Sequence, residues 1–288
     1  MKISVYITSY NQKEFLKVAV DSVLHQTLMP FEIILIDDCS TDGSVELIES
    51  YADRYPDLIR THINDKNLGI TRTRNVALSM VRGDYVSWLD GDDMYLPEKL
   101  EKQWQVIQES NADLVYTNYY YAQSDIDNRI GKWFEDPSVL PSVEDFFPAV
   151  LGRKFPNGAL FRYELVSKAL IEKAGSYDER LEIYEDFDFR IRLAKHARPQ
   201  FVDQPLSVYR MHAQGLSRAK VALHQKCLSY IYDKYNEDLL ALPPNSQVEI
   251  QERIAAIFNH FEAKSSADSF NFKKSLKRLL YRLIGRNK

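Results

Sequence analysis

The first third of the chain alternates between continuous apolar runs and amphipathic segments. Residues 31–38 contain a continuous apolar run that ends in acid, which predicts a strand buried on both faces, as in a parallel sheet. Residues 2–8, with a short alternating apolar run, also predict a strand. Residues 12–24 and 43–55 repeat apolar side chains every three or four positions, which predicts helices. The same pattern predicts a strand at 58–64, a helix at 71–80 and a strand at 84–90. This order of elements predicts a parallel sheet covered by helices.

The first helix has a capping signal at its start. Asn11 is followed three positions later by Glu14, which is the spacing of a capping box. We therefore expect Asn11 to be the N-cap of this helix.

The remaining chain continues as α/β and then becomes helical. The pattern predicts helices at 98–110, 141–152 and 184–197, strands at 112–122 and 200–212, and a loop or strand followed by a helix at 157–175. Residues 122–142 are polar and irregular. From about residue 219 onward only helices are predicted. We expect an α/β domain at 1–218, with a mostly parallel central sheet flanked by helices, and a helical extension at 219–288.

Composition excludes several classes of protein. The chain has 288 residues, a net charge of −4 and 45% hydrophobic residues, which is typical of a globular protein. Cys39 and Cys227 lie far apart, so neither a disulfide framework nor a zinc site is expected. The N-terminus lacks a signal-peptide pattern, and no apolar stretch approaches the roughly 20 residues that cross a bilayer. We expect a cytoplasmic protein.

The C-terminal segment 271–288 is strongly basic. It holds seven lysines and arginines and no acidic residue, and its leucines recur at helical spacing. Such a basic amphipathic helix can lie on an anionic membrane surface, or it can pack against its own domain or a partner subunit. Both alternatives stay open. Nucleic acid is not an expected partner because the rest of the chain is acidic.

Polar side chains follow three of the predicted strands. Thr8 and Tyr10 follow the first strand, Asp37 and Asp38 end the second, and an acidic turn ends a later one. Ligands of open α/β sheets bind outside the carboxyl ends of the strands. These side chains therefore predict a binding site on one edge of the sheet.

The acidic turn contains Asp90, Asp92 and Asp93 within four positions. Carboxylates so close together raise one another's pKa unless a cation is present. Oxygen ligands favour Mg²⁺ or Mn²⁺, and Mg²⁺ takes its remaining ligands from water and phosphates. A phosphorylated ligand is then the expected partner, and a solvated acidic turn is the alternative.

Two further groups belong to this edge. Asp38 can accept hydrogen bonds from a nucleobase or a ribose, whereas Asp42 or Ser44 can cap the next helix. Arg72 and Arg74 enter the helix at 71–80 and can bind phosphates or pair with the acidic turn.

Four motifs, in order, resemble the inverting glycosyltransferases of family 2, which have the GT-A fold. They are "ISVYITSYNQKEFLKVAVDSVLHQT", "EIILIDDCSTDGS", "NLGITRTRNVAL" and "GDYVSWLDGDDMYLPEKL". The resemblance resumes at "GSYDERLEIYEDFDFRIRLA" and "LSVYRMH", and it spans about residues 1–215. It implies a nucleotide-binding half at 1–110 and an acceptor-binding half at 111–218. One departure is Thr8, where the family often has proline.

The resemblance also implies roles for individual residues. Thr8, Tyr10 and Asp38 would contact the nucleotide, with Tyr10 near the base and Asp38 at its edge. The nucleotide-sugar site would further include Arg74, Asp90, Asp93 and Arg210; the metal ligands would be Asp92, Asp90 and His212, with Mn²⁺ or Mg²⁺ as the ion. A lone histidine is usually structural, but His212 follows a strand together with Arg210, as in the family.

Asp186 would be the catalytic base. Inversion requires one displacement, and the acceptor hydroxyl then needs a base within hydrogen-bond distance. Asp186 opens a helix, which favours its ionised form, and Asp188 should point away. The segment 154–162 is expected to face the acceptor.

The implied reaction moves a sugar from a nucleoside diphosphate sugar, preferably a UDP-sugar, to a hydroxyl of a glycan or lipid-linked glycan. Bacterial surface polysaccharide synthesis is the expected setting. A nucleotidyltransferase is one alternative, but the turn after the first strand lacks the glycine-rich phosphate loop it requires. A non-catalytic carbohydrate-binding or scaffold protein is another, although the expected base and metal ligands are present.

Overall fold

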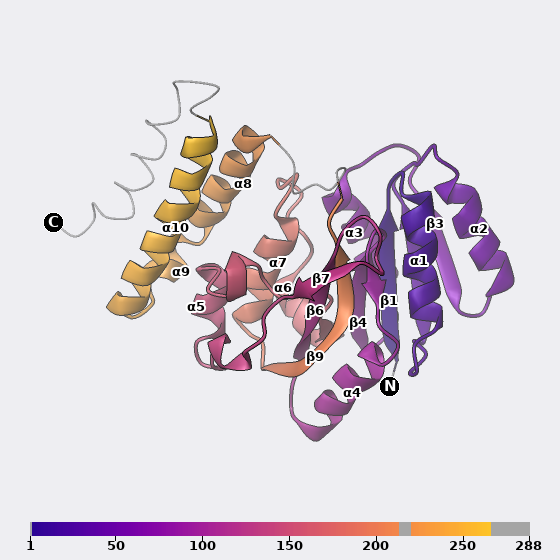
Figure 1. The fold of residues 1–288 in the computed structure, drawn as a ribbon, viewed down its shortest axis with the longest axis horizontal. Coiled ribbons are helices and arrows are strands. Elements are labelled where there is room, and N and C mark those ends of the chain that lie inside the picture. The colour runs from indigo at the N-terminus through magenta and orange to yellow at the C-terminus, as the bar shows by residue number, and fades with distance from the viewer. Residues whose placement is uncertain (1, 213–219, 266–288) are drawn as a thin grey trace.

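The computed structural model describes residues 2–212 and 220–265 (Figure 1). The basic segment 271–288 and the expected domain boundary at residue 218 both lie outside the described residues. Within the part described, no helix is long and apolar enough to cross a membrane.

A nine-stranded mixed sheet forms the centre of the molecule. Its main path runs β3-β2-β1-β4-β8-β6-β9-β5, and β7 pairs with β6. The strands are β1 (Ile3–Ser9), β2 (Glu32–Asp37), β3 (Ile59–Ile63), β4 (Tyr85–Asp90), β5 (Met94–Tyr95), β6 (Leu114–Ala122), β7 (Arg129–Lys132), β8 (Leu165–Ser167) and β9 (Pro199–Arg210). The α/β fold with a central sheet flanked by helices is confirmed.

The parallel arrangement holds for the first half of the sheet. β3, β2, β1 and β4 run parallel, which puts Thr8 beside Asp90 and Ser9 beside Asp37. In the second half β8 is antiparallel to both β4 and β6, whereas β6 and β9 are parallel. β7 lies in the region 122–142 that the pattern described as irregular.

Helices cover both faces of the sheet and continue beyond it. They are α1 (Lys13–Leu24), α2 (Ser44–Arg54), α3 (Ile70–Met80), α4 (Lys99–Glu109), α5 (Phe146–Leu151), α6 (Lys168–Ala174), α7 (Glu185–Ala194), α8 (Val221–Lys234), α9 (Asn236–Leu240) and α10 (Pro244–Ser265). Successive strand residues point to opposite faces, so Val5 and Ile33 pack in the core with α1, α2 and α4, while Tyr6 and Ile34 pack in the core with α3 and α7. This two-sided burial explains the continuous apolar run of β2.

The predicted capping by Asn11 is wrong. α1 begins at Lys13, and no side chain of its own N-terminus caps it. Asn11 has a positive φ of 52° and accepts a hydrogen bond from the Thr41 N–H instead. Asp42, from the loop before α2, accepts the Lys13 N–H at 2.9 Å. A cap from a neighbouring loop has no signature in the local sequence.

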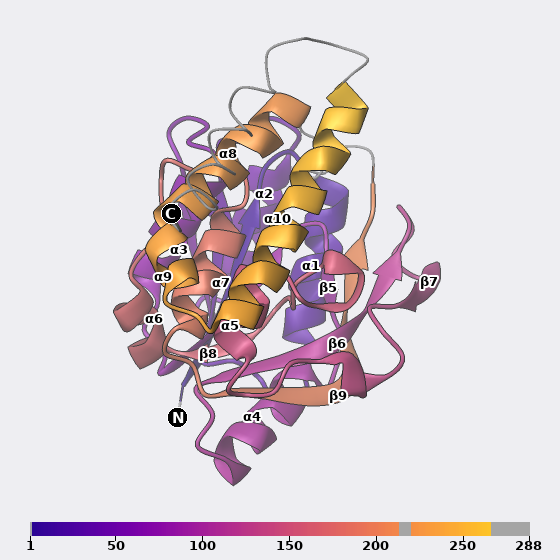
Figure 2. The same ribbon diagram turned by 90° about the vertical axis from the view of Figure 1, so that its left-hand side faces the viewer.

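The C-terminal helices are integral to the second half. α8 and α10 lie side by side at the end of the molecule opposite α2 (Figures 1 and 2). Their Leu228, Ile254 and Phe258 belong to the same buried cluster as Phe187 of α7. Asp188 of α7 is fully buried and accepts hydrogen bonds from Lys234 and Tyr235 at the end of α8. The extension therefore shares a core with the sheet.

Candidate active site

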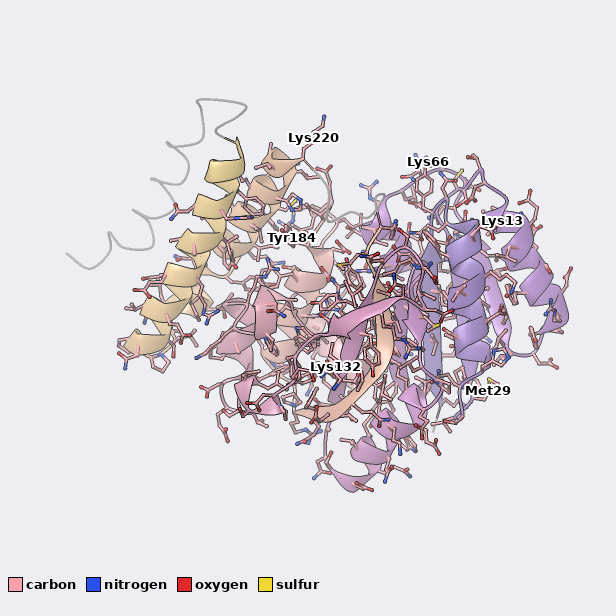
Figure 3. The ribbon with its side chains drawn as sticks, viewed as in Figure 1. Lys13, Met29, Lys66, Lys132, Tyr184 and Lys220 are labelled. Atoms are coloured by element: carbon pink, nitrogen blue, oxygen red, sulfur yellow. The ribbon has the colours of Figure 1, made fainter. Side chains whose placement is uncertain are left out.

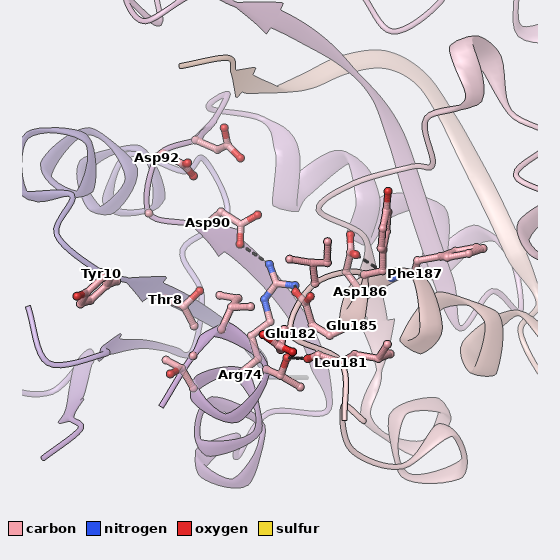
Figure 4. Close-up of a pocket in the computed structure, with 18 of the residues that line it drawn as sticks. Thr8, Tyr10, Arg74, Asp90, Asp92, Leu181, Glu182, Glu185, Asp186 and Phe187 are labelled. Atoms are coloured by element: carbon pink, nitrogen blue, oxygen red, sulfur yellow. Dashed lines mark hydrogen bonds and ion pairs between the residues drawn. The ribbon is translucent and has the colours of Figure 1, made fainter. Parts of the chain in front are cut away.

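One pocket of about 1120 Å³ opens along the carboxyl edge of the parallel strands. It contains every residue to which the family resemblance gave a role: Thr8, Tyr10, Asp38, Arg74, Asp90, Asp92, Asp93, Asp186, Arg210 and His212. Figure 4 shows Thr8, Tyr10 and Asp92 on one side of Arg74, and Asp186 on the other. Two halves of the chain thus contribute to one site.

Polar atoms without partners concentrate in this pocket. Among the described residues, nine buried side-chain nitrogen or oxygen atoms lack a hydrogen bond, and five of them belong to pocket residues. These five atoms are Thr8 Oγ1, Ser9 Oγ, Arg74 Nε, Arg153 Nε and Arg210 Nη2. Buried polar groups are normally paired. A polar ligand in the pocket would supply the missing partners.

Each aspartate of the acidic turn has a different partner. Asp90 Oδ1 accepts from Arg74 Nη2 at 2.5 Å, and Asp92 Oδ2 lies 2.7 Å from His212 Nε2. Asp93 accepts from the hydroxyl of Tyr163 and, at 2.7 Å, from the backbone N–H of Arg210. The three carboxylates are therefore close together in sequence but have different bonding partners.

Asp93 lies beneath the pocket surface. It is 1% exposed, and burial together with the charges of Asp92 and Asp90 raises its pKa well above the usual range. The expected direct contact of Asp93 with the nucleotide sugar is not supported, because both of its oxygens are already bonded. Its position instead fixes the end of β9, from which Arg210 and His212 project.

The turn between Asp90 and Asp92 approaches β1 closely. A Cβ atom on Gly91 would lie 2.9 Å from the Thr8 carbonyl oxygen and 3.0 Å from Gln12 Oε1. The Gly91 N–H donates to that same Thr8 carbonyl at 3.0 Å. Glycine at this position lets the acidic turn rest directly on the end of β1.

A divalent cation fits the rim through two protein groups. The carboxylate of Asp92 and the imidazole of His212 face one another, and Mn²⁺ accepts both ligand types. The part of the chain that the structure describes holds no group of three or more histidine, cysteine or acidic residues arranged for a metal. Arg74 holds one oxygen of Asp90, so the expectation that Asp90 joins Asp92 and His212 at the metal stays a prediction. Mg²⁺ and Mn²⁺ sites commonly take their other ligands from phosphates and water.

One end of the pocket, where the nucleotide was expected, is formed by β1 and the turn before α3. Tyr10 is 47% exposed, so its ring is available for stacking, while Thr8 is buried. Asp38 accepts hydrogen bonds from Asn64, Leu68 and Gly69 and so holds that turn. Asp37, expected at the same edge, bonds to Ser40 and does not line the pocket.

Arg74 links the two halves of the site. The residue is 5% exposed, and its guanidinium bonds Asp90 on one side and Glu185 on the other, at 2.5 Å and 2.6 Å. The sequence had left two alternatives for this arginine, namely binding of phosphates and pairing with the acidic turn, and the structure shows the pairing. Glu185 was not predicted as a site residue. Burial raises its pKa although the charge of Arg74 opposes that rise.

Asp186 lies at the first turn of α7 with a one-third exposed side chain. The Phe187 N–H donates to Oδ1 at 2.8 Å, and Arg190 donates to Oδ2 at 2.5 Å. Burial would raise the pKa of Asp186, but the charges of Arg190, Arg74 and Arg162 lower it to about 2. The carboxylate is therefore fixed and ionised. Asp188 points away from the pocket into the core, as expected.

A buried ion pair supports Asp186 from behind. Glu164 is fully buried and binds Arg190 through both oxygens, at 2.7 Å and 3.2 Å. Neither Glu164 nor Arg190 was predicted, because they lie on different elements and nothing in the local sequence relates them. The only available signal was the spacing of Asp186 and Arg190, which are an acid and an arginine four positions apart and can pair on a helix.

The backbone before α7 is held in an unusual conformation. Tyr184 has a φ of 64°, which is uncommon outside glycine, and its hydroxyl lies 2.9 Å from Nδ1 of His224 on α8. Tyr184 lines the pocket, and Figure 3 shows it beside the C-terminal helices. On the opposite side, Thr71 of α3 donates a hydrogen bond to the Leu181 carbonyl. Helices from both halves thus position the start of α7.

Comparisons with known proteins agree with this geometry. The family model described as glycosyl transferase family 2 matches residues 4–168. An uncharacterised glycosyltransferase of Haemophilus influenzae is 27% identical over 98% of this chain and 94% of its own length. The putative teichuronic acid biosynthesis glycosyltransferase TuaG of Bacillus subtilis is 35% identical over 52% of this chain and 59% of its own.

The fold also matches a solved structure. S. aureus TarS 1–349, in complex with UDP-GlcNAc, superposes with a TM-score of 0.66 at 19% identity, covering 99% of this chain and 80% of that one. The family match extends over more than half of the residues. The chain therefore belongs to glycosyl transferase family 2 and is a glycosyltransferase with the GT-A fold.

Proposed function

We propose that this glycosyltransferase is metal-dependent and inverting, and that it moves a sugar from a nucleoside diphosphate sugar to a hydroxyl of a glycan or lipid-linked glycan. The observation that carries the proposal is the single pocket in which Asp186 faces the rim formed by Asp90 and Asp92. A UDP-sugar is the preferred donor, since TarS binds UDP-GlcNAc with the same fold. Surface polysaccharide synthesis is the proposed setting, as for TuaG.

The donor would lie along β1 and the acidic turn. Tyr10 would stack on the base, and the unpaired hydroxyl of Thr8 would contact the nucleotide. Asp90, one oxygen of which Arg74 holds, would contact the ribose with the other. Arg210 would donate from its unpaired Nη2 to the diphosphate. Asp92 and His212 would hold Mn²⁺ or Mg²⁺, which when bound stabilises negative charge on the leaving diphosphate.

Asp186 would accept the proton of the acceptor hydroxyl. As the new C–O bond forms, the bond from the anomeric carbon to the diphosphate breaks, and the electron pair leaves with the nucleoside diphosphate. Inversion follows because the attack comes from the face opposite to the leaving group. The low pKa of Asp186 keeps the carboxylate in its ionised form at neutral pH, which is the form that a base requires.

A donor screen tests the proposal. UDP-, GDP-, dTDP- and CMP-sugars are incubated with the protein and Mn²⁺, and release of the nucleotide is measured with and without EDTA. We expect release from UDP-sugars above all, and loss of release with EDTA. A protein that neither binds nor cleaves any donor with the metal present would refute the proposal.

The role of the base is tested by Asp186→Asn. The amide keeps the shape and the hydrogen bond from Phe187 but cannot accept the proton, so kcat should fall by about 10²–10⁴-fold with donor binding unchanged. Donor affinity is measured by calorimetry, and transfer by nucleotide release with an acceptor. Asp203→Asn, on β9 outside the pocket, is the matched control. Loss of donor binding in Asp186→Asn would show that this residue is not the base.

A further inference from the structure

The acceptor side of the pocket contains two arginines that form no ion pair with a described residue. Four acidic residues line this side, and each is paired. Glu179 pairs with Arg72, and Glu182 pairs with Lys226. Glu185 pairs with Arg74, and Asp186 pairs with Arg190. Arg153 and Arg162 also line the pocket, and no carboxylate of the described residues lies within 4.0 Å of either guanidinium. Arg153 and Arg162 are therefore the two arginines on this side that form no ion pair with a described residue.

Arg162 is fixed by aromatic rings and not by an acid. Its guanidinium carbon lies 4.0 Å from the centre of the Tyr209 ring, and the Tyr119 hydroxyl lies beside it. An arginine stacked on an aromatic face keeps N–H groups at the edge of its plane for a further partner. Its charge acts on Asp186 strongly enough to lower the pKa of that carboxyl. Arg162 thus lies close to the reacting end of the acceptor site.

Arg153 lies on the other side of the same helix start. Its guanidinium carbon is 5.7 Å from the ring centre of Tyr184 and 5.5 Å from that of Phe187, the residues on either side of Glu185 and Asp186. Its Nε is buried and has no hydrogen-bond partner among the described residues. An orphaned buried N–H in a ligand pocket indicates that a ligand atom accepts from it.

We propose that the acceptor carries a phosphate or carboxylate group, which Arg153 and Arg162 bind while Asp186 takes the proton of the neighbouring hydroxyl. Arginine binds both anions through paired N–H donors and is suited to a site that is partly buried. The inference rests on the proposed function in one respect, namely that the acceptor lies around Asp186. Arg210 remains for the donor diphosphate through its unpaired Nη2, so the two anions have separate arginines.

The test measures binding and not transfer, so that it does not depend on catalysis. Glucose, glucose 6-phosphate and glucuronate are titrated at constant ionic strength into the protein with Mn²⁺, with and without saturating UDP. We expect at least one of the two anionic sugars to bind about tenfold more tightly than glucose, since a charge-assisted hydrogen bond adds about that factor. The preferred anion identifies the group on the acceptor.

Variants locate the anion. Arg162→Gln and Arg153→Gln should each reduce the preference for the anionic sugar about tenfold. Lys154→Gln is the matched control, because Lys154 follows Arg153 but binds Glu249 of α10 at 3.0 Å, outside this pocket. Equal thermal midpoints exclude misfolding, and if one arginine variant fails to fold the other carries the test.

Three results would overturn the inference. The first is equal affinity for glucose and both anionic sugars, and the second is a preference that survives both arginine substitutions. The third is displacement of the anionic sugar by UDP, which would place the anion in the donor site. If UDP fails to bind but the arginine-dependent preference is present, the proposed donor is wrong and the anionic acceptor site stands.

Discussion

Asp90, Asp92 and Asp93 are neighbours in the chain, and at the residue scale their surroundings decide what each can do. The sequence predicted that they share one edge of the sheet, and the structure confirms it. It could not predict that Arg74, His212 and Tyr163 divide the three carboxylates among them, because these partners come from α3, the end of β9 and the segment before β8. Side-chain pairing across a fold depends on packing that no local pattern contains.

The pair of Arg190 and Glu164 gives a prediction about pH. Arg190 lowers the pKa of Asp186, so the base is ionised throughout the neutral range. In the double variant Arg190→Gln, Glu164→Gln that charge is lost, and burial then raises the pKa of Asp186. The base becomes protonated as pH falls, so kcat should decline at a higher pH than in the wild type. The pH–rate profile of transfer measures this shift.

The control for this experiment is Arg192→Gln, which removes a guanidinium from Asp188 and not from Asp186. Its acid limb should coincide with that of the wild type. A double variant whose rate falls equally at every pH would mean that the pair acts on folding alone. The single variant Arg190→Gln is less suitable, because an unpaired buried Glu164 costs about 3–5 kcal/mol.

At the scale of elements, long and strongly patterned segments were predicted well, and short ones were not. β1, β2, α3 and α7 lie where the apolar pattern placed them. β5 has two residues, Met94 and Tyr95, and is defined by its pairing with β9, so no periodicity could identify it. β8 has three residues and inserts between β4 and β6 in the antiparallel direction. The sequence pattern did not reveal this direction, and we therefore expected a mostly parallel sheet.

A buried lysine in α4 predicts how stability depends on pH. Lys99 is fully buried, bonds Ser87 and Gln103, and lies 3.9 Å from the centre of the Tyr95 ring. Burial lowers its pKa well below the usual range, against the opposing charge of Glu164. The unfolded chain keeps this proton up to about pH 10.4, so it binds more protons than the folded protein between the two pKa values. In that range Lys99 makes the free energy of unfolding rise with pH.

Lys99→Met should therefore remove part of this rise. As pH rises from the lowered pKa of Lys99 toward about 10, the wild type should gain stability relative to the variant by up to about 1.4 kcal/mol per pH unit. Urea unfolding at several pH values measures the difference. Lys102→Met, on the same helix with a side chain 37% exposed, should follow the wild type. Parallel curves for wild type and Lys99→Met would show that Lys99 stays protonated in the fold.

At the scale of the whole molecule, the C-terminal helices belong to the same cooperative structure as the sheet. The sequence predicted the helices but treated them as an extension, because amphipathic patterns show which face is buried and not against what. In the structure, Leu228, Ile254 and Phe258 complete the core around Phe187. The start of α7, and with it Asp186, thus rests on α8 and α10.

Phe258→Ala tests this cooperativity. The side chain is fully buried, so its truncation should lower the free energy of unfolding by about 3–5 kcal/mol in a single transition. Val248→Ala, at a position on the same helix that is 54% exposed, should change it by less than about 0.5 kcal/mol. Circular dichroism and tryptophan fluorescence should report the same midpoint. Two separate transitions would show that α8–α10 unfold independently of the sheet.

The bridge from Asp90 through Arg74 to Glu185 also limits how such enzymes can be recombined. Donor and acceptor halves invite exchange between relatives as a route to new sugar linkages. In this chain the two halves share one guanidinium, which belongs to the donor half and binds a carboxylate of the acceptor half. A chimera joined after residue 110 would inherit Arg74 from one parent and position 185 from the other. Hybrids should fold and catalyse transfer only where the second parent also has an acidic residue that can pair with this arginine.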